Sequence, residues 1–232
     1  MKVSIAIPTY EMNGSGAGCL KYCLESIRNQ TYLPDEIIVS DHSINDEIKN
    51  LCNAWNEKFN IKYIENKEGR GSLSNNLNSC IKYASGDIIK FIMQDDYLFN
   101  RYSLAKIVNN FDENKSWLVS SYYHTDDRKN LYSLHIPTIS KNMLFINLIG
   151  TPTCLTIKNN TDIWFDHELN WYVDSDFYTQ LYLKYGKPII LKSPTAVQLL
   201  WEGQTTNTLI NSSVVKNEGL YLMRKYGAYR NG

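Results

Sequence analysis

The feature that most constrains the fold is the regular alternation of short apolar runs with amphipathic segments in the first hundred residues. Runs rich in β-branched residues predict strands at residues 3–7, 36–40, 61–64 and 88–93. Apolar residues at helical spacing predict helices at 19–30, 46–59 and 73–84, the last ended by Gly86. Strand–helix–strand units of this length predict an α/β fold with a doubly wound parallel sheet covered by helices.

The second half of the sequence is less regular. Apolar spacing predicts helices at 102–111, 141–148, 174–185 and 214–226. Shorter apolar runs predict strands at 118–122, 154–157 and 188–191. No repeat, low-complexity tract or linker separates the halves, so we expect the 232 residues to form one continuous domain.

The predicted sheet also indicates where a ligand would bind. In parallel α/β sheets, ligands collect at the carboxyl ends of the strands. The segments that follow the four predicted strands are 9–11, 41–43, 66–71 and 95–96. Together they carry carboxylates, glycines and amide side chains. The sequence therefore predicts a nucleotide and metal pocket at this edge of the sheet.

Asp95 and Asp96, directly after the fourth predicted strand, give the sharpest chemical signal. Two adjacent carboxylates repel each other unless a cation or hydrogen-bond donors offset the charge. A divalent metal bridging to a diphosphate is one solution, because Mg²⁺ and Mn²⁺ favour carboxylate and phosphate oxygens. The alternative is an acidic pair leading into the helix predicted at 102–111, where it would interact with the helix dipole. The pair alone does not decide between them.

Charge and cysteine content exclude several classes of protein. The 24 acidic and 24 basic residues balance, so no overall field favours a nucleic-acid polymer or an anionic membrane. No apolar run reaches the roughly 18 residues of a transmembrane helix, and the N-terminus lacks a signal-peptide pattern. The five cysteines show no zinc spacing and are expected to pack as small apolar residues. We therefore expect a cytoplasmic protein that binds any nucleotide as a small ligand.

Five segments, in consistent order over residues 1–205, resemble glycosyltransferase family 2. They are Ile-Ala-Ile-Pro-Thr-Tyr at 5–10, Glu-Ile-Ile-Val-Ser-Asp at 36–41, the helix–glycine–strand–Asp-Asp segment at 84–96, Gly-Thr-Pro-Thr at 150–153 and Val-Asp-Ser-Asp-Phe at 173–177. The resemblance implies the GT-A fold over 1–232, with a Rossmann-like, mostly parallel sheet flanked by helices. Residues 1–98 would form the nucleotide-sugar-binding half and residues 99–232 a smaller acceptor-binding half.

The resemblance also implies residues that contact the donor. Pro8, Thr9 and Tyr10, with Glu11 beside them, would line the nucleotide. Asp41 would accept a hydrogen bond from an N–H of the base; its alternative role is an Asx turn before the next helix.

A further donor contact is expected on the helix predicted at 73–84. Of Asn75, Asn76 and Asn78, the last corresponds best to the family's donor-facing asparagine. Three asparagines are poor helix formers, which indicates a polar role, although they could equally face solvent.

The metal-binding motif departs from the family's usual pattern. Where the family often has Asp-x-Asp-Asp, Met93 occupies the first of these positions. Asp95 and Asp96 would then divide contacts to the ribose and to Mn²⁺ or Mg²⁺, and we expect Asp96 on the metal. Either assignment stays open for Asp95, as a nucleotide contact or a second metal ligand.

A second departure lies near the end of the resemblance. The family's late histidine is replaced by Glu202, which could bind the metal. Gln204 and Thr205 could instead contact phosphate, or the segment could be an ordinary loop.

Asp174 corresponds to the family's catalytic base. A base is required because an acceptor hydroxyl is a poor nucleophile and must lose its proton as it attacks the anomeric carbon. Asp176 is the rival candidate. Capping of the helix at 174–185 is a compatible structural role for Asp174. Thr153 and Trp171 are expected to shape the acceptor pocket.

The resemblance therefore implies an inverting transferase that uses a nucleotide-diphosphate sugar, with a UDP-sugar favoured. Its acceptor would be a glycan or a lipid-linked saccharide in bacterial surface-polysaccharide synthesis, and a lipid-linked acceptor would bring the protein to the inner face of the membrane.

Two other classes remain as alternatives. A sugar nucleotidyltransferase would need a cationic glycine-rich loop, whereas the glycine-rich stretch 12–18 has no cation before Lys21. Against a non-catalytic nucleotide-sugar-binding protein stand Asp95, Asp96 and Asp174.

Overall fold

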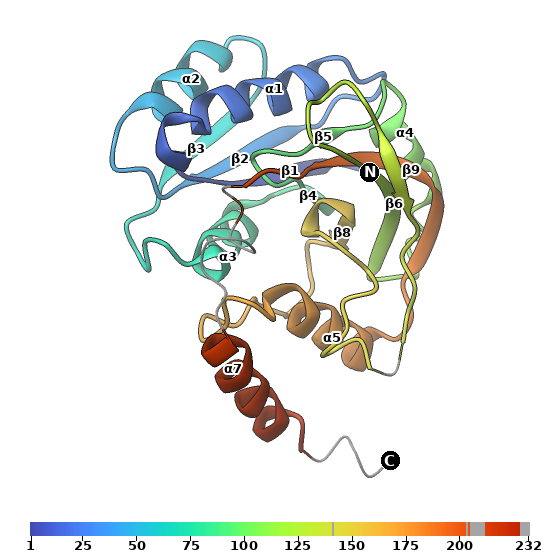
Figure 1. Cartoon of the computed structure of the whole chain (residues 1–232). Helices are drawn as coiled ribbons and strands as arrows, with labels where there is room; N and C mark the ends of the chain where they lie inside the picture. The colour runs from blue at the N-terminus through green and yellow to red at the C-terminus, as the bar shows by residue number, and fades with distance from the viewer. Residues whose placement is uncertain (141, 203, 205–211, 228–232) are drawn as a thin grey trace.

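The computed structural model describes residues 1–140, 142–202, 204 and 212–227. Its N-terminal half is a parallel sheet in the order β3-β2-β1-β4 (Figure 1). The strands are β1 (Val3–Thr9), β2 (Glu36–Asp41), β3 (Ile61–Glu65) and β4 (Ile88–Phe91). The connecting helices are α1 (Gly16–Arg28), α2 (Glu47–Trp55) and α3 (Leu73–Tyr83). This arrangement confirms the predicted parallel α/β unit.

The second half extends the same sheet with mixed pairing. Its strands are β5 (Tyr97–Leu98), β6 (Trp117–Thr125), β7 (Tyr132–His135), β8 (Leu155–Lys158) and β9 (Ile189–Leu199). β8 lies antiparallel between β4 and β6, and β9 runs parallel to β6. β5 and β7 pair antiparallel with β9 and β6. The remaining helices are α4 (Ser103–Asn110), α5 (Val173–Tyr185) and α7 (Ser212–Lys225), with short 3-10 turns η1 (Met12–Gly14) and η2 (Pro152–Cys154).

Several elements of the second half differ from the prediction. The helix expected at 141–148 is wrong: residues 142–145 form turns, and residue 141 lies outside the described residues. Asn147 closes this segment, since its Oδ1 accepts hydrogen bonds from the backbone of Ile149 and Gly150. β7 was not predicted. β9 continues past Pro194 because the pairing with β6 shifts register beside Ser121.

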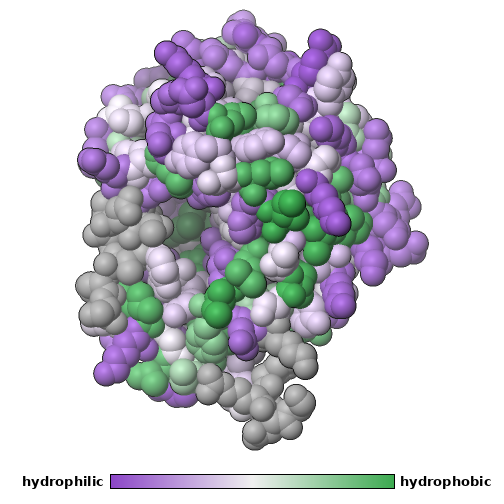
Figure 2. All heavy atoms as spheres, turned by 45° about the vertical axis from the view of Figure 1, so that its right-hand side comes forward, coloured by the Kyte–Doolittle hydropathy of each residue, from purple (hydrophilic) through white to green (hydrophobic). Residues whose placement is uncertain are grey.

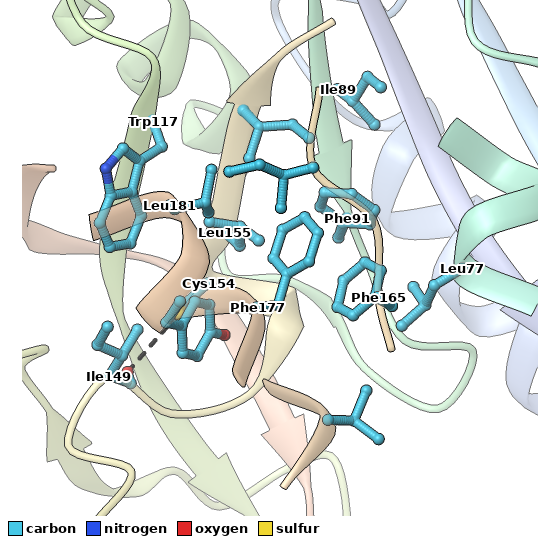
Figure 3. Packing of buried hydrophobic residues seen from close by; sticks show 14 of the residues in the cluster. Leu77, Ile89, Phe91, Trp117, Ile149, Cys154, Leu155, Phe165, Phe177 and Leu181 are labelled. Atoms are coloured by element: carbon cyan, nitrogen blue, oxygen red, sulfur yellow. Dashed lines mark hydrogen bonds between the residues drawn. The ribbon is translucent and has the colours of Figure 1, made fainter. Parts of the chain in front are cut away.

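Two apolar layers cover the two faces of the sheet. One joins α1, α2 and α4 to the face that carries Ile5, Ile7 and Val39. The other joins α3 and α5 to the opposite face, where Phe165 stacks on Phe177 at a centroid distance of 3.8 Å (Figure 3). All five cysteines are free and buried, as expected for apolar packing.

Part of the surface is also apolar. Figure 2 shows hydrophobic side chains gathered on the face turned toward the viewer. Large apolar side chains that are more than one third exposed occur around β7 and the turns that follow it, namely Leu131, Leu134, Ile136, Ile146 and Leu148. A group of this kind is more typical of a contact surface than single exposed apolar residues are.

A close backbone approach at Gly86 tests the packing of the parallel half. A Cβ there would lie 2.7 Å from the backbone nitrogen of Ser4 and 3.0 Å from the carbonyl oxygen of Lys2. Gly86→Ala should therefore lower the free energy of unfolding by about 1–3 kcal/mol, measured by urea denaturation. In the control Gly18→Ala, the new Cβ meets nothing within 4 Å and lies in α1, so stability should rise by up to about 1 kcal/mol. Equal effects of the two substitutions would contradict this account.

Candidate functional site

The carboxyl ends of β1 and β2 meet at Asp41, which is 1% exposed. Its Oδ1 accepts hydrogen bonds from Thr9 Oγ1 at 3.1 Å and from the backbone and hydroxyl of Ser43 at 3.0 and 2.7 Å. Its Oδ2 accepts one from Tyr63 Oη at 2.8 Å. The Asx turn considered from the sequence is therefore present. A base could still reach Oδ2, the oxygen with a single donor, so the contact to the base stays a prediction.

The loop after β1 is tied to the segment after β4 by Gln94, a residue that the sequence argument missed. Gln94 is 3% exposed. Its Oε1 accepts from Tyr10 N at 2.9 Å, and its Nε2 donates to the carbonyls of Tyr10 and Gly16 at 2.9 and 2.8 Å. The side chain of Tyr10 remains 43% exposed at this edge. The predicted lining residues 8–11 are thus held beside Asp95.

The remaining lining residues differ in exposure. Pro8 and Thr9, the last two residues of β1, are both buried. Glu11 is half-buried, and its carbonyl accepts hydrogen bonds from Gly14 N and Gly16 N at 2.8 and 2.9 Å, which close the turn into α1.

Asn78 does not face the strand ends as predicted. Its Nδ2 donates to the carbonyl of Phe165 at 2.8 Å, and its Oδ1 accepts from Phe165 N at 2.9 Å. Both groups of the amide therefore fix the chain before α5 onto α3. Asn76 is the asparagine that reaches the edge, where its Nδ2 donates to Thr9 O at 3.0 Å. Sequence spacing could not separate the two, because their partners lie far away in the chain.

Asp96 and Asp95 have different surroundings. Asp96 is 2% exposed, and its carboxylate accepts hydrogen bonds from the hydroxyl of Thr153 and, at 3.0 Å, from Leu199 N. Asp95 is half-buried and accepts one from Trp201 Nε1 at 2.9 Å. The geometry thus favours Asp95, and not Asp96 as we expected, for contact with a ligand.

The electrostatic cost predicted for the acidic pair is present. Burial raises the pKa of Asp95. Burial, and then the charge of Asp95, raise the pKa of Asp96 well above its ordinary value. Lys90, fully buried in β4, donates to the carbonyl of Thr153, and burial lowers its pKa to about 8. The charge of Arg128 lowers the pKa of Asp95, but burial outweighs it.

The acidic pair fits a metal only together with a ligand. Within the described part of the chain, no three His, Cys, Asp or Glu side chains gather as a preformed metal site. Mg²⁺ is commonly held by one or two carboxylates and completed by water and substrate phosphates. Asp95 is a suitable carboxylate for such a site.

Asp174 lies in the first turn of α5 and is half-buried. Among the described residues, none donates a hydrogen bond to its carboxylate, and burial raises its pKa to about 7. Burial is the main cause of the raised pKa values of Tyr122, Cys154 and Tyr178, and the charge of Asp174 contributes to each. The charge of Asp96 also contributes to the raised pKa of Tyr122.

Asp176 is fully buried and fully paired. Its carboxylate accepts hydrogen bonds from Gln180 Nε2 at 2.7 Å and Tyr226 Oη at 2.7 Å, and lies 2.9 Å from Lys225 Nζ. These contacts join α5 to the C-terminal part of α7. Between the two candidate bases, Asp174 is the one with a carboxylate free to accept a proton.

Among the described residues that follow β9, few are suited to hold a metal. Glu202 is exposed in a turn, and Gln204 Nε2 donates to Leu199 O at 2.8 Å. Thr205 lies outside the described residues. Trp201, which the sequence argument did not single out, supplies the hydrogen bond to Asp95.

A pocket of about 460 Å³ lies beyond Asp41, at the ends of β2 and β3. Tyr63, whose hydroxyl is bonded to Asp41, forms part of its wall. The other lining residues are Ser43, Ile44, Asn45, Asp46, Glu65, Lys67 and Arg70.

The fold and this arrangement of carboxylates can be compared with known proteins. Residues 4–178 match the family model of glycosyl transferase family 2. The chain belongs to glycosyltransferase family 2. The segments that carried the resemblance fall within the matched residues, and the predicted GT-A fold is confirmed by solved structures.

Three similar proteins illustrate the range of the family. A poly(ribitol-phosphate) beta-glucosyltransferase of Bacillus spizizenii is 33% identical over 119 residues, covering 50% of this chain and 18% of its own length. TarS 1–349 of S. aureus, in complex with UDP-GlcNAc, superposes with a TM-score of 0.72 at 21% identity, over 91% of this chain and 62% of that chain. Mannosyltransferase PcManGT of Pyrobaculum calidifontis, in complex with GDP-Man and Mn²⁺, superposes with a TM-score of 0.63 at 18% identity. The match covers 87% of this chain and 57% of that chain.

The match with this chain thus spans 18% of the length of that glucosyltransferase and less than two thirds of each of the two solved chains. In this family 2 member, none of the described helices combines the length and apolar character needed to cross a membrane.

The surroundings of Asp174 and Asp176 predict opposite effects on stability. Because folding raises the pKa of Asp174 to about 7, the free energy of unfolding should fall as pH rises from about 4 to 7. Asp174→Asn removes this buried charge and should stabilise the protein at pH 8 by about 1–3 kcal/mol. Asp176→Asn removes the charged acceptor that Lys225 and Tyr226 share, although Lys225 keeps its contact to Asp166, and it should destabilise the protein by a similar amount. Thermal unfolding at pH 5 and 8 measures both; destabilisation by Asp174→Asn at pH 8 would contradict the unpartnered carboxylate.

Proposed function

We propose that this chain is an inverting glycosyltransferase that moves a sugar from a nucleotide-diphosphate donor, a UDP-sugar by preference, to a hydroxyl of a glycan or lipid-linked saccharide. The observation that carries the proposal is the half-buried carboxylate of Asp174, which has no hydrogen-bond donor among the described residues and a pKa raised to about 7 by burial. A general base works best when its pKa is near the working pH, and Asp174 meets this condition.

The proposed reaction is a single displacement. The acceptor hydroxyl binds next to Asp174, gives its proton to the carboxylate, and forms a bond to the anomeric carbon as the bond to the diphosphate breaks. Attack from the face opposite the leaving group inverts the anomeric configuration. The titratable groups on which the charge of Asp174 acts, Tyr122, Cys154 and Tyr178, have pKa values that burial raises further above neutral pH, so they add no charge beside the base.

The leaving diphosphate is proposed to bind at Asp95. A bound Mn²⁺ or Mg²⁺ would neutralise the developing charge of the diphosphate. Asp95 would hold it with one carboxylate oxygen, since Trp201 already donates to the other. Asp96, paired with Thr153 and Leu199, would hold the turn after β4 in place and would not bind the metal. The Mn²⁺ reported for the Pyrobaculum calidifontis mannosyltransferase supports the use of a divalent metal.

The nucleotide is proposed to extend from Asp95 toward Asp41. Pro8, Thr9, Tyr10 and Glu11 form the edge between them, and the pocket of about 460 Å³ lies beyond Asp41 at the base end. The UDP-GlcNAc complex of S. aureus TarS supports a UDP-sugar.

The acceptor is proposed to be a bacterial surface glycan or its lipid-linked precursor. The name of the Bacillus spizizenii relative, a poly(ribitol-phosphate) glucosyltransferase, supports a polymer of this class. Contact with the inner face of the membrane would then be made through the acceptor.

Release of nucleoside diphosphate tests the function directly. The protein is incubated in Mn²⁺ with UDP-GlcNAc, UDP-glucose or GDP-mannose, and free UDP or GDP is measured. UDP should be released, with kcat increasing as pH rises through about 7 because Asp174 must be ionised. Asp174→Asn should lower kcat by about 10²–10⁴-fold and leave the affinity for UDP unchanged.

Each alternative function gives a different result in this assay. Pyrophosphate released from UTP and a sugar phosphate would indicate a nucleotidyltransferase. Binding of UDP-sugar with no release would indicate a binding protein. Full activity of Asp174→Asn would exclude this residue as the base.

The metal assignment is tested by UDP binding. If Asp95 holds the metal, Mn²⁺ should tighten UDP binding to the wild type, and Asp95→Asn should lose this enhancement while keeping metal-free affinity. Asp96→Asn should keep the enhancement but lower the melting temperature, because Asp96 is 2% exposed and joins Thr153 to Leu199. Calorimetric titration with and without Mn²⁺ separates the two. The reverse pattern would restore Asp96 as the ligand.

A further inference from the structure

Helix α7 lies beyond residues 4–178, which the family model matches, and it contacts the start of α5 through a buried carboxylate. Glu218 is 7% exposed. Its two carboxylate oxygens accept hydrogen bonds from three successive backbone N–H groups, those of Asn170 and Trp171 at 2.9 Å and Tyr172 at 3.1 Å. No side chain of its own caps α5 at Tyr172. Glu218 therefore fixes, from another helix, the backbone that leads into α5 up to its N-cap residue, Tyr172.

The rest of α7 fastens the same stretch of chain on both sides. Tyr221 Oη donates to Asp166 Oδ2 at 2.7 Å, and Lys225 Nζ donates to the same oxygen at 2.6 Å. Lys225 also lies 2.9 Å from Asp176, which Tyr226 contacts as well. Residues 166–176 are thus held at their start, middle and end by one helix.

Asp174 lies two residues after the last N–H that Glu218 accepts. Since none of the described side chains bonds to its carboxylate, the backbone of the first turn of α5 sets where that carboxylate lies. We propose that Glu218 is a positioning residue that fixes this turn and so holds Asp174 in its half-buried place. The inference rests on the proposed role of Asp174 as the base.

The size of the effect follows from the geometry that group transfer requires. A displacement of about 1 Å in a catalytic group can lower a rate by about 10²-fold. Without three fixed N–H groups, the turn would move and admit water to Asp174. The titratable groups whose pKa values the charge of Asp174 affects are Tyr122 from β6, Cys154 from η2 and Tyr178 from α5 itself, and burial is the main cause of the raised pKa of each. Water would therefore be the main influence on its titration.

The test reads the Asp174 carboxyl directly, so it does not depend on knowing the acceptor. Protein labelled with ¹³C at aspartate carboxyls is titrated by NMR, and Asp174 is assigned by the signal missing from Asp174→Asn. In the wild type its pKa should be near 7. In Glu218→Gln and Glu218→Asp it should fall toward the ordinary range of aspartate. Glu218→Asp keeps the charge but moves the carboxylate away from the three N–H groups by one C–C bond, about 1.5 Å.

Two control variants separate positioning from loosening of α7. Tyr221→Phe removes one contact of the same helix to Asp166 but leaves the three N–H groups paired, and Lys216→Gln changes an exposed residue of α7. Both should leave the pKa of Asp174 unchanged. With UDP-GlcNAc and Mn²⁺, Glu218→Gln should lower kcat for UDP release by about 10–100-fold, with the donor KM within about twofold.

The outcomes distinguish this inference from the proposed function. A wild-type titration of Asp174 in both Glu218 variants, or an equal shift in Tyr221→Phe, would overturn the positioning role even if Asp174→Asn is inactive. If Asp174→Asn is active, Asp174 is not the base. A change in its pKa in the Glu218 variants would then have no bearing on catalysis.

Discussion

The buried carboxylate of Asp96 is the interaction on which the joining of the two halves depends. It follows β4 in the parallel half, yet its hydrogen-bond donors come from Thr153 before β8 and from the last residue of β9, Leu199. An ionisable group that is 2% exposed is tolerated only when its oxygens are paired, so these segments must meet at this point. Once they meet, Asp95 is turned outward and Trp201 is brought to it.

The acidic residues of the site divide by their partners. Asp41, Asp96 and Asp176 each accept several hydrogen bonds from distant segments, and each fixes part of the fold. Asp95 has one donor, and Asp174 has none among the described residues. A carboxylate that is already paired is a poor base or ligand, because chemistry would first have to break its bonds. Pairing therefore indicates which acids maintain structure and which remain available for reaction.

The sequence predicted the parallel half well because its signals are local. Each strand has its own apolar run, and the strand-end rule placed Asp41 and the acidic pair at one edge. The second half depends on pairing between distant segments: β9 passes Pro194 through a register shift, and no local pattern announced β7. The sequence could not show which of Asp95 and Asp96 is available to a metal for the same reason. Asp96 is paired with Leu199, which lies 103 residues away in the chain. Asn78 was misplaced for this reason too.

Asp174, the proposed base, shows why a reactive carboxylate needs support from the rest of the fold. A half-buried carboxylate without donors costs stability whenever it is ionised, and its free energy would fall if the turn opened and water entered. Other contacts of the fold must therefore stabilise the closed conformation at the start of α5. We propose that Glu218 and Lys225 provide this support from α7, at positions where their own charges are paired. This proposal accounts for the many bonds between a segment outside the family match and the chain that leads to Asp174, the proposed base.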